Sequence, residues 1–141
     1  MEHPDQAQRL RDDPGLWDTA VEEMLRWGSS IHNFRRTATR DTELGGVQIS
    51  EGDKVVMYYG GQPGPGGLED PHTFDVGRTP NDHVTFGGGG VHYCLGASLA
   101  RAEIRATMRQ VVERLPGIQL AGSRSVYGAT SSTASSVFVT W

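Results

Sequence analysis

Two stretches of the chain place apolar residues at helical spacing. From about residue 14 to residue 27, apolar side chains recur every three or four positions, which predicts a helix with one buried face. Pro14 suits the first turn of this helix and Gly28 suits its end. A second and clearer helix is predicted over 95–115, because Pro116 and Gly117 stop it there. We expect burial of Leu16, Trp17, Ala20, Val21, Met24 and Leu25 in the first helix, and of Leu95, Leu99, Ala102, Ile104, Met108, Val111, Val112 and Leu115 in the second.

Between these helices the period of the pattern changes. Residues 31–59 contain two glycine-bearing turn signals and a β-branched and aromatic run from Val55 to Tyr59, which predicts a small antiparallel sheet. Residues 69–85 are polar and aperiodic, so they predict a long loop, and a long ordered loop usually has a function. The tail over 123–136 is rich in small polar residues, and only 137–139 could form a strand. The pattern predicts a mainly α chain with a small antiparallel β-sheet, an α+β fold.

Composition narrows the classes of partner. The 141 residues carry a net charge of −4 with scattered Lys and Arg, and they do not indicate the one-signed basic face that binds phosphates or anionic lipid. We therefore expect no nucleic acid partner. No apolar run approaches the ~20 residues of a membrane span or forms a secretory signal. The single cysteine excludes an internal disulfide. These observations predict a soluble, cytoplasmic protein without a membrane span.

The densest chemical signal is the run from Phe86 to Gly96, which contains four consecutive glycines and the only cysteine, Cys94. A lone cysteine is more often a small buried hydrophobic residue than a ligand. Here, however, Cys94 lies just before a predicted helix, whose dipole stabilises a thiolate, and the glycines would let the backbone approach a flat macrocycle. A phosphate-binding glycine loop is the competing interpretation, but no Lys followed by Ser or Thr comes after the glycines.

These residues resemble the haem-ligand signature of the cytochrome P450 family, in which a Phe, a glycine-rich turn, a basic residue and a Cys followed by one residue and a Gly form the loop below the haem. The spacing from Phe86 to Cys94 is one residue longer than the commonest form, and this four-glycine variant resembles bacterial P450s that act on sterols and branched lipids. The resemblance implies haem b (iron protoporphyrin IX) as cofactor, with Cys94 as axial iron ligand and His92 bound to a propionate. It also implies that Phe86 packs below the ring and that Gly87 and Gly96 belong to the cofactor-binding loop.

Glu23 and Arg26 lie three positions apart on the first predicted helix and share a face. Alone, they would suggest a solvated ion pair worth roughly 0.2–0.5 kcal/mol. The run from Glu23 to Arg26 resembles the K-helix motif of the P450 family, whose Glu and Arg form a buried network with an Arg of the meander before the haem loop. Arg78 is the candidate for that third charge. The resemblance implies structural roles for all three.

The run from Phe34 to Asp41 resembles the strand that follows in the same family, and matching by residue makes Arg36 a second haem-propionate partner. A guanidinium offers the two-pronged geometry that a carboxylate accepts. The alternative is an ordinary exposed strand charge, and the adjacent Arg35 leaves open which of the two arginines faces the cofactor. Side chains around 31–35 are expected to face the substrate.

The resemblance also implies an activity: a haem-thiolate monooxygenase that hydroxylates a hydrophobic, lipid or steroid-like substrate with O2, supplied with electrons by a ferredoxin-type redox partner. The distal helix, with the acid and alcohol pair that delivers protons, would lie upstream of residue 1, so the catalytic residues are unknown and turnover by this chain alone is not expected. The alternatives are a non-enzymatic, truncated or decayed gene product with weak or no haem binding, or an interaction module. The domain plan is an incomplete C-terminal portion of the P450 fold over 1–141, with the K-helix motif at 23–26, sheet 31–59, meander 69–85, haem loop 86–96 and L-helix 95–115.

Two segments depart from the resemblance in the same way. In place of the run 61–68, Gly-Gln-Pro-Gly-Pro-Gly-Gly-Leu, the family usually has a segment of the type Ser-Ala-Asn-Arg-Asp-Pro-Ala-Val-Phe. A GC-rich coding stretch for that segment, translated one base out of phase, yields the observed run. Residues 127–138 arise likewise from codons for a family-like ending, Arg-Gly-Asn-Phe-Ile-Asn-Gly-Ile-Lys-Arg-Leu. We hypothesise that 60–68 and 123–138 are out-of-frame translations.

The coding DNA tests this hypothesis. Translated in its other two frames, it is expected to encode family-like peptides opposite both segments. Absence of such peptides from both frames would rule the hypothesis out.

Overall fold

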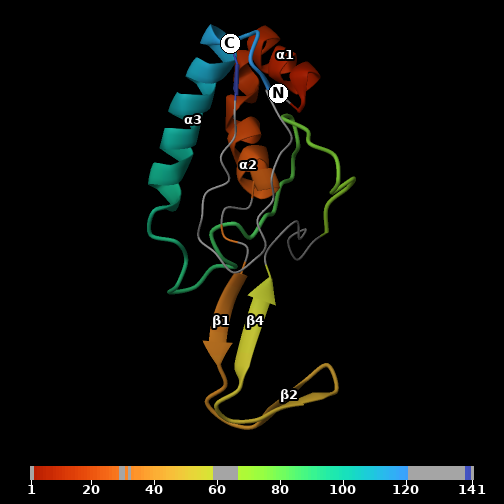
Figure 1. Cartoon of the computed structure of the whole chain (residues 1–141), viewed down its shortest axis with the longest axis vertical. Coiled ribbons are helices and arrows are strands. Elements are labelled where there is room, and N and C mark those ends of the chain that lie inside the picture. Colours follow the sequence, from red (N-terminus) through yellow and green to blue (C-terminus); the bar gives the residue numbers. More distant parts are fainter. Residues whose placement is uncertain (1, 29–30, 32, 59–66, 121–138, 141) are drawn as a thin grey trace.

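The computed structural model describes residues 2–28, 31, 33–58, 67–120 and 139–140. The helices gather at one end of an elongated molecule, and the β1–β4 ribbon extends toward the other end (Figure 1). This arrangement confirms the predicted mainly α chain with antiparallel β structure, although the one small sheet that was predicted forms as separate two-stranded pairs. In chain order the elements are α1 (Pro4–Asp12), a 3-10 turn (Pro14–Leu16), α2 (Trp17–Gly28), β1 (Asn33–Thr37), β2 (Thr42–Leu44), β3 (Val47–Ile49), β4 (Lys54–Tyr58), α3 (Ala97–Arg114), β5 (Gln119–Leu120) and β6 (Val139–Thr140).

Both predicted helices are present, and both begin later than the apolar pattern suggests. Before α2, the residues Pro14–Leu16 form a 3-10 turn, and the Asp13 carboxylate accepts a hydrogen bond of 2.8 Å from the Gly15 N–H. Before α3, the chain makes a turn in which the Ala97 N–H donates to the Cys94 carbonyl at 3.2 Å. The glycine loop that contains Cys94 and the helix after it are therefore joined by a backbone hydrogen bond.

Helix α1 was not predicted from the sequence. It is strongly polar, and only Ala7 and Leu10 are buried, so the apolar period is too short to recognise. The helix is tied to α3 by Arg11, whose Nη1 donates to the Val112 carbonyl at 3.4 Å. It therefore covers one end of the α2–α3 pair.

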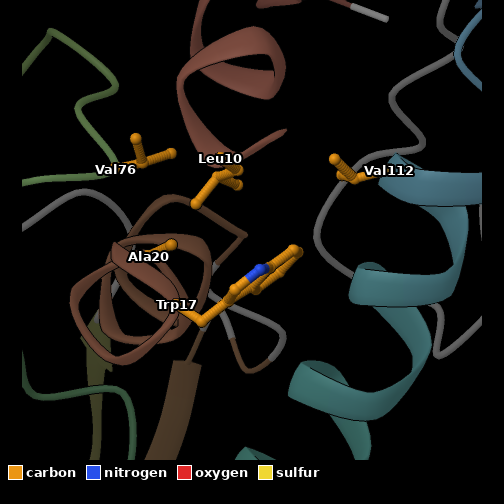
Figure 2. Packing of buried hydrophobic residues seen from close by; sticks show 5 residues of the cluster. All are labelled: Leu10, Trp17, Ala20, Val76 and Val112. Atoms are coloured by element: carbon orange, nitrogen blue, oxygen red, sulfur yellow. The ribbon is translucent and has the colours of Figure 1, made fainter. Parts of the chain in front are cut away.

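The core lies where the three helices meet the loop after β4. Figure 2 shows its buried side chains converging from α1, α2, α3 and the loop. The buried members are Leu10, Trp17, Ala20, Val76 and Val112, with Leu16, Met24, Phe74 and Met108 packed against them.

The predicted burial is confirmed on α2 and is wrong for part of α3. In α2, Trp17, Ala20, Val21 and Leu25 are buried. In and just before the first turns of α3, by contrast, Leu95 and Leu99 are exposed, and so is Ala102. The reason is that α1 and α2 cover only the face of α3 that carries Ala97, Met108 and Val112. The predicted apolar positions that are half-buried are Ile104, Met108, Val111 and Leu115.

The predicted sheet forms as separate antiparallel pairs. β1 pairs with β4, with Phe34 opposite Met57 and Arg36 opposite Val55, and β2 pairs with β3. Gly45 and Gly46 turn the chain between β2 and β3 at φ of 57° and 81°, which an L side chain rarely adopts. A third pair joins β5 to β6.

The loop between β4 and α3 is held against the helices by polar contacts. Within the described part of this loop there is no helix or strand, as the sequence predicts. Arg9 of α1 forms an ion pair of 2.8 Å with Asp75, and Thr19 of α2 donates to the Val76 carbonyl at 2.6 Å. The segments proposed to be out of frame lie outside the described residues, apart from Gly67 and Leu68. No helix in the described part of the chain is long and apolar enough to cross a membrane.

Candidate functional site

A cavity of about 770 Å³ lies between β1, the end of α2, the glycine loop and the first turns of α3. This volume falls within the range of about 300–1,000 Å³ that is usual for small-molecule and cofactor sites. Its walls are mostly apolar or glycine, and three side chains on them carry a sulfur or a basic group. The lining residues are Leu25, Ile31, Phe34, Arg36, Val84, Thr85, Phe86, Gly87, Gly88, Gly89, His92, Cys94, Ala100 and Ile104.

The structure brings the sequence-predicted cofactor residues to this one cavity, with the exception of Gly96. Arg36 comes from β1, whereas Phe86, Gly87, His92 and Cys94 come from the glycine loop about fifty positions later. Although Gly96 does not line the cavity, it lies beside the sulfur, because a Cβ added there would be 4.0 Å from Cys94 Sγ. The thiol can bind a metal, and the two basic side chains can bind carboxylates. Together with the apolar walls, these residues fit a flat apolar group that carries a metal and carboxylates.

Of the two adjacent arginines on β1, only Arg36 lines the cavity. Side chains alternate along a strand, so Arg36 lies on the same face as Phe34 and Arg35 lies on the other face. The Arg36 guanidinium is 5.6 Å from the centre of the Phe34 ring and donates to the Arg35 carbonyl at 3.1 Å. Strand alternation therefore separates two residues that the sequence alone left equivalent.

The glycine loop has a backbone shape that needs glycine at several positions. Gly87, Gly89 and Gly90 have φ of 99°, 99° and 81°, values that residues with a Cβ rarely adopt. The loop closes on itself because the Cys94 N–H donates to the Phe86 carbonyl at 3.0 Å. Cys94 itself is exposed, so its sulfur is accessible at the cavity wall.

Helix α2, whose Leu25 lines the cavity, also carries the predicted charged pair Glu23 and Arg26, and both residues are buried. Glu23 is fully buried and Arg26 is 4% exposed. Arg26 holds both carboxylate oxygens, at 2.7 and 2.8 Å, and Arg78 Nε lies 3.2 Å from each oxygen. The same carboxylate accepts from Asn81 Nδ2 at 3.0 Å and from the Asp75 N–H at 2.9 Å. The structure thus brings the three predicted charges together.

Both arginines also hold the backbone of the loop. Arg26 donates to the carbonyls of Pro71 and Thr73, and Arg78 donates to those of Glu69, Asp70 and Thr73. Burial by itself would raise the pKa of the Glu23 carboxyl. The hydrogen bonds from Arg26, the Asp75 N–H and Arg78 outweigh burial and lower that pKa, so Glu23 stays ionised.

A second charged cluster, next to the first, was missed by sequence analysis. Glu22 binds Arg101 through both oxygens, at 2.6 and 2.9 Å, and lies 3.1 Å from Nε2 of His83. Hydrogen bonds from Arg101 hold the pKa of Glu22 below its ordinary value. The partners are 79 and 61 positions away from Glu22, so no local spacing could have indicated the cluster.

Comparison with known proteins gives one consistent result. The model of the family described as Cytochrome P450 matches residues 7–116. The chain is 45% identical over 118 residues to the methyl-branched lipid omega-hydroxylase of Mycobacterium tuberculosis, covering 82% of this chain and 28% of that protein. It is 43% identical over 123 residues to the steroid C26-monooxygenase of Rhodococcus jostii, covering 86% of this chain and 26% of that protein. The chain therefore spans less than a third of the length of these two relatives.

Solved structures agree with the sequence relatives. A Mycobacterium marinum cytochrome P450 in complex with pseudoionone has a TM-score of 0.75 at 46% identity, covering 86% of this chain and 30% of that one. Bacillus megaterium CYP109E1 in complex with testosterone has a TM-score of 0.81 at 30% identity, covering 99% of this chain and 39% of that one. The helices and small sheets described above thus match one portion of a larger fold.

The buried Glu23 carboxylate is expected to control stability. Glu23→Gln keeps the shape of the side chain but leaves Arg26 and Arg78 without their counter-charge, and breaking a buried pair in this way costs about 3–5 kcal/mol. The free energy of unfolding, measured with denaturant on the full chain, should fall by that amount.

The matched control is Glu113→Gln. Glu113 forms an exposed ion pair with Arg109 four residues away, so its loss should cost no more than about 0.5 kcal/mol. Equal losses for the two variants would contradict the special role of the buried pair.

Proposed function

The chain belongs to the cytochrome P450 family, and on that basis we propose that it is part of a haem-thiolate monooxygenase that hydroxylates a hydrophobic, lipid or steroid-like substrate. The proposal rests on one observation: Cys94, His92 and Arg36 line the same cavity. The family implies a haem-iron cofactor, and we propose haem b. When bound, this group supplies the dioxygen chemistry that oxidises an unactivated C–H bond.

Cys94 is proposed to bind the iron through its sulfur. The thiol is exposed on the cavity wall and lies three residues before α3, whose N-terminal dipole favours a negative sulfur. The glycines on the same wall carry no side chains, so a flat ring can approach the backbone there. Gly96 lies next to the sulfur, since a Cβ added there would be in ordinary van der Waals contact with Cys94 Sγ at 4.0 Å.

His92 and Arg36 are proposed to bind the two carboxylates of the cofactor. They come from the glycine loop and from β1, respectively, and both line the cavity that also holds the sulfur. A guanidinium binds a carboxylate with two parallel hydrogen bonds, and an imidazole N–H supplies one. Together they would fix the orientation of the bound cofactor in the cavity.

The apolar side chains are proposed to exclude water from the ring and to face the substrate. Leu25, Phe34, Ala100 and Ile104 come from α2, β1 and α3, and they give the cavity a predominantly apolar wall. Phe34 and Ile31 remain 44% and 45% exposed. These two partly exposed side chains could contact a hydrophobic substrate or another segment of a longer protein.

The substrate class is proposed from the relatives. One is named for omega-hydroxylation of methyl-branched lipids and another for oxygenation at steroid C26. One oxygen atom of O2 would enter the C–H bond and the other would leave as water, which consumes two electrons and two protons. We propose a ferredoxin-type redox partner as the electron source and the cytoplasm as the location.

A second candidate is a module that binds haem weakly, or not at all, and turns over no substrate. The specific observation in its favour is the partial exposure of the apolar cavity wall at Ile31 and Phe34. A haem bound to this chain alone would keep part of its apolar surface in water, and that surface contributes ~25 cal/mol per Å² when buried.

Arg36 and Arg35 provide a matched pair that tests cofactor binding. Arg36→Gln removes a charged hydrogen-bond donor from the cavity, and a bond of that kind contributes about 1.5–3 kcal/mol. Haem titration of the full chain, followed by absorbance, should therefore give a Kd roughly 10- to 100-fold weaker. Arg35→Gln, on the opposite face of β1, should leave the Kd unchanged. Equal effects of the two substitutions would contradict the assignment of Arg36.

A further inference from the structure

Glu22, His83 and Arg101 form a charged cluster that contacts the glycine loop (86–96) at Phe86. Glu22 lies on α2 and Arg101 lies on α3, so their ion pair spans the two helices. Arg101 donates from Nε and Nη2 to the two carboxylate oxygens of Glu22, at 2.6 and 2.9 Å. A two-pronged pair of this kind fixes the plane of the guanidinium as well as its position.

That guanidinium is placed over an aromatic ring of the ligand loop. Its central carbon lies 4.7 Å from the centre of the Phe86 ring, within the range of a cation–π contact. His83 and Tyr93 each lie 6.4 Å from the same ring, centre to centre. The Phe86 ring is therefore contacted by His83 before the loop, by Tyr93 within the loop and by Arg101 on α3.

The position of Phe86 is in turn coupled to Cys94. The Phe86 carbonyl accepts the hydrogen bond of 3.0 Å from the Cys94 N–H, which closes the loop. The segment of chain entering the loop is tied to α2 as well, since Thr85 Oγ1 donates to the Leu25 carbonyl at 3.1 Å. A displacement of the Phe86 backbone would therefore disturb the hydrogen bond that positions the residue carrying the sulfur.

We propose that Glu22, Arg101 and Phe86 form a clamp that holds the Cys94 loop in its ligand-ready shape before any cofactor binds. Glu22 and Arg101 are positioning residues, because they act on the sulfur through Phe86. The inference rests on the proposed function in taking Cys94 as the ligand. It adds that the order of the loop is a property of the protein and does not depend on the iron.

A solvated ion pair that only joins α2 to α3 is the competing explanation, and the chain contains such a pair. Asp18 on α2 contacts Arg105 on α3, with side chains 83% and 47% exposed. It joins the same two helices as the Glu22–Arg101 pair. Within the described part of the chain, however, Arg105 forms no ion pair or cation–π contact with the glycine loop. Arg105→Met is therefore a matched control for Arg101→Met.

Hydrogen exchange of the full chain without haem tests the clamp. In Arg101→Met, backbone amides of the loop, including that of Cys94, should exchange roughly two- to thirtyfold faster than in the wild type. Phe86→Leu should produce a similar increase, and combining it with Arg101→Met should add little. In Arg105→Met the loop should exchange at the wild-type rate, and Arg101→Lys should restore part of the protection.

Amides of the core, in α2 around Ala20 and in α3 around Val112, provide the internal reference. Unchanged exchange in the core with faster exchange in the loop supports the clamp. Equal acceleration of loop and core would mean that Arg101 supports only the global fold, and it would overturn the proposal, as would equal effects of Arg101→Met and Arg105→Met.

Haem titration of the same variants separates this proposal from the proposed function. If the loop responds as expected while wild-type chain binds no haem, the clamp stands and the haem-binding function of this chain fails. If haem binds through Cys94 while the loop of Arg101→Met exchanges at the wild-type rate, the function stands and the clamp fails.

Discussion

The described structure is organised around the fully buried carboxylate of Glu23 and its ion pairs with Arg26 and Arg78. A charge in that position is tolerated only when its surroundings supply donors, and here they come from α2 through Arg26 and from the loop through Arg78, Asn81 and the Asp75 N–H. The two arginines also bind backbone carbonyls of the loop. The described residues of this loop form no helix or strand, and these contacts fix their path over the helices up to the start of the glycine loop.

The candidate site is assembled on that frame from elements that are distant in the sequence. β1 contributes Arg36, the glycine loop contributes His92 and Cys94, and α3 closes one side of the cavity. The neighbouring residue Glu22 contacts the glycine loop indirectly, because its ion-pair partner Arg101 lies over the Phe86 ring. Two adjacent acidic residues on α2, Glu22 and Glu23, thus contact two successive parts of the chain: Glu23 binds the loop over 69–85 and Glu22 binds Arg101, which lies over Phe86 of the glycine loop.

Much of this arrangement could be predicted from the sequence where the signal is local. The apolar stripe of α2, the antiparallel pairing after it and the glycine loop before Cys94 are all visible as short-range patterns. Resemblance to a family supplied the long-range pairing of Glu23 with Arg78. What failed lacked a local signal: α1 has too few apolar positions, and the Glu22–Arg101 pair joins residues 79 positions apart. The burial expected at Leu95 and Leu99 was wrong because periodicity shows which face of a helix is apolar, but not whether another element covers it.

The proposed function requires Cys94 to present its sulfur as an iron ligand. The most direct measurement is the difference spectrum of the reduced, carbon-monoxide-bound chain after addition of haem, recorded in parallel for the wild type and Cys94→Ala. If the sulfur binds the iron, the wild type should show a thiolate-haem band that is lost in the variant. Identical spectra for the two proteins, or a wild-type spectrum without the thiolate band, would contradict this claim.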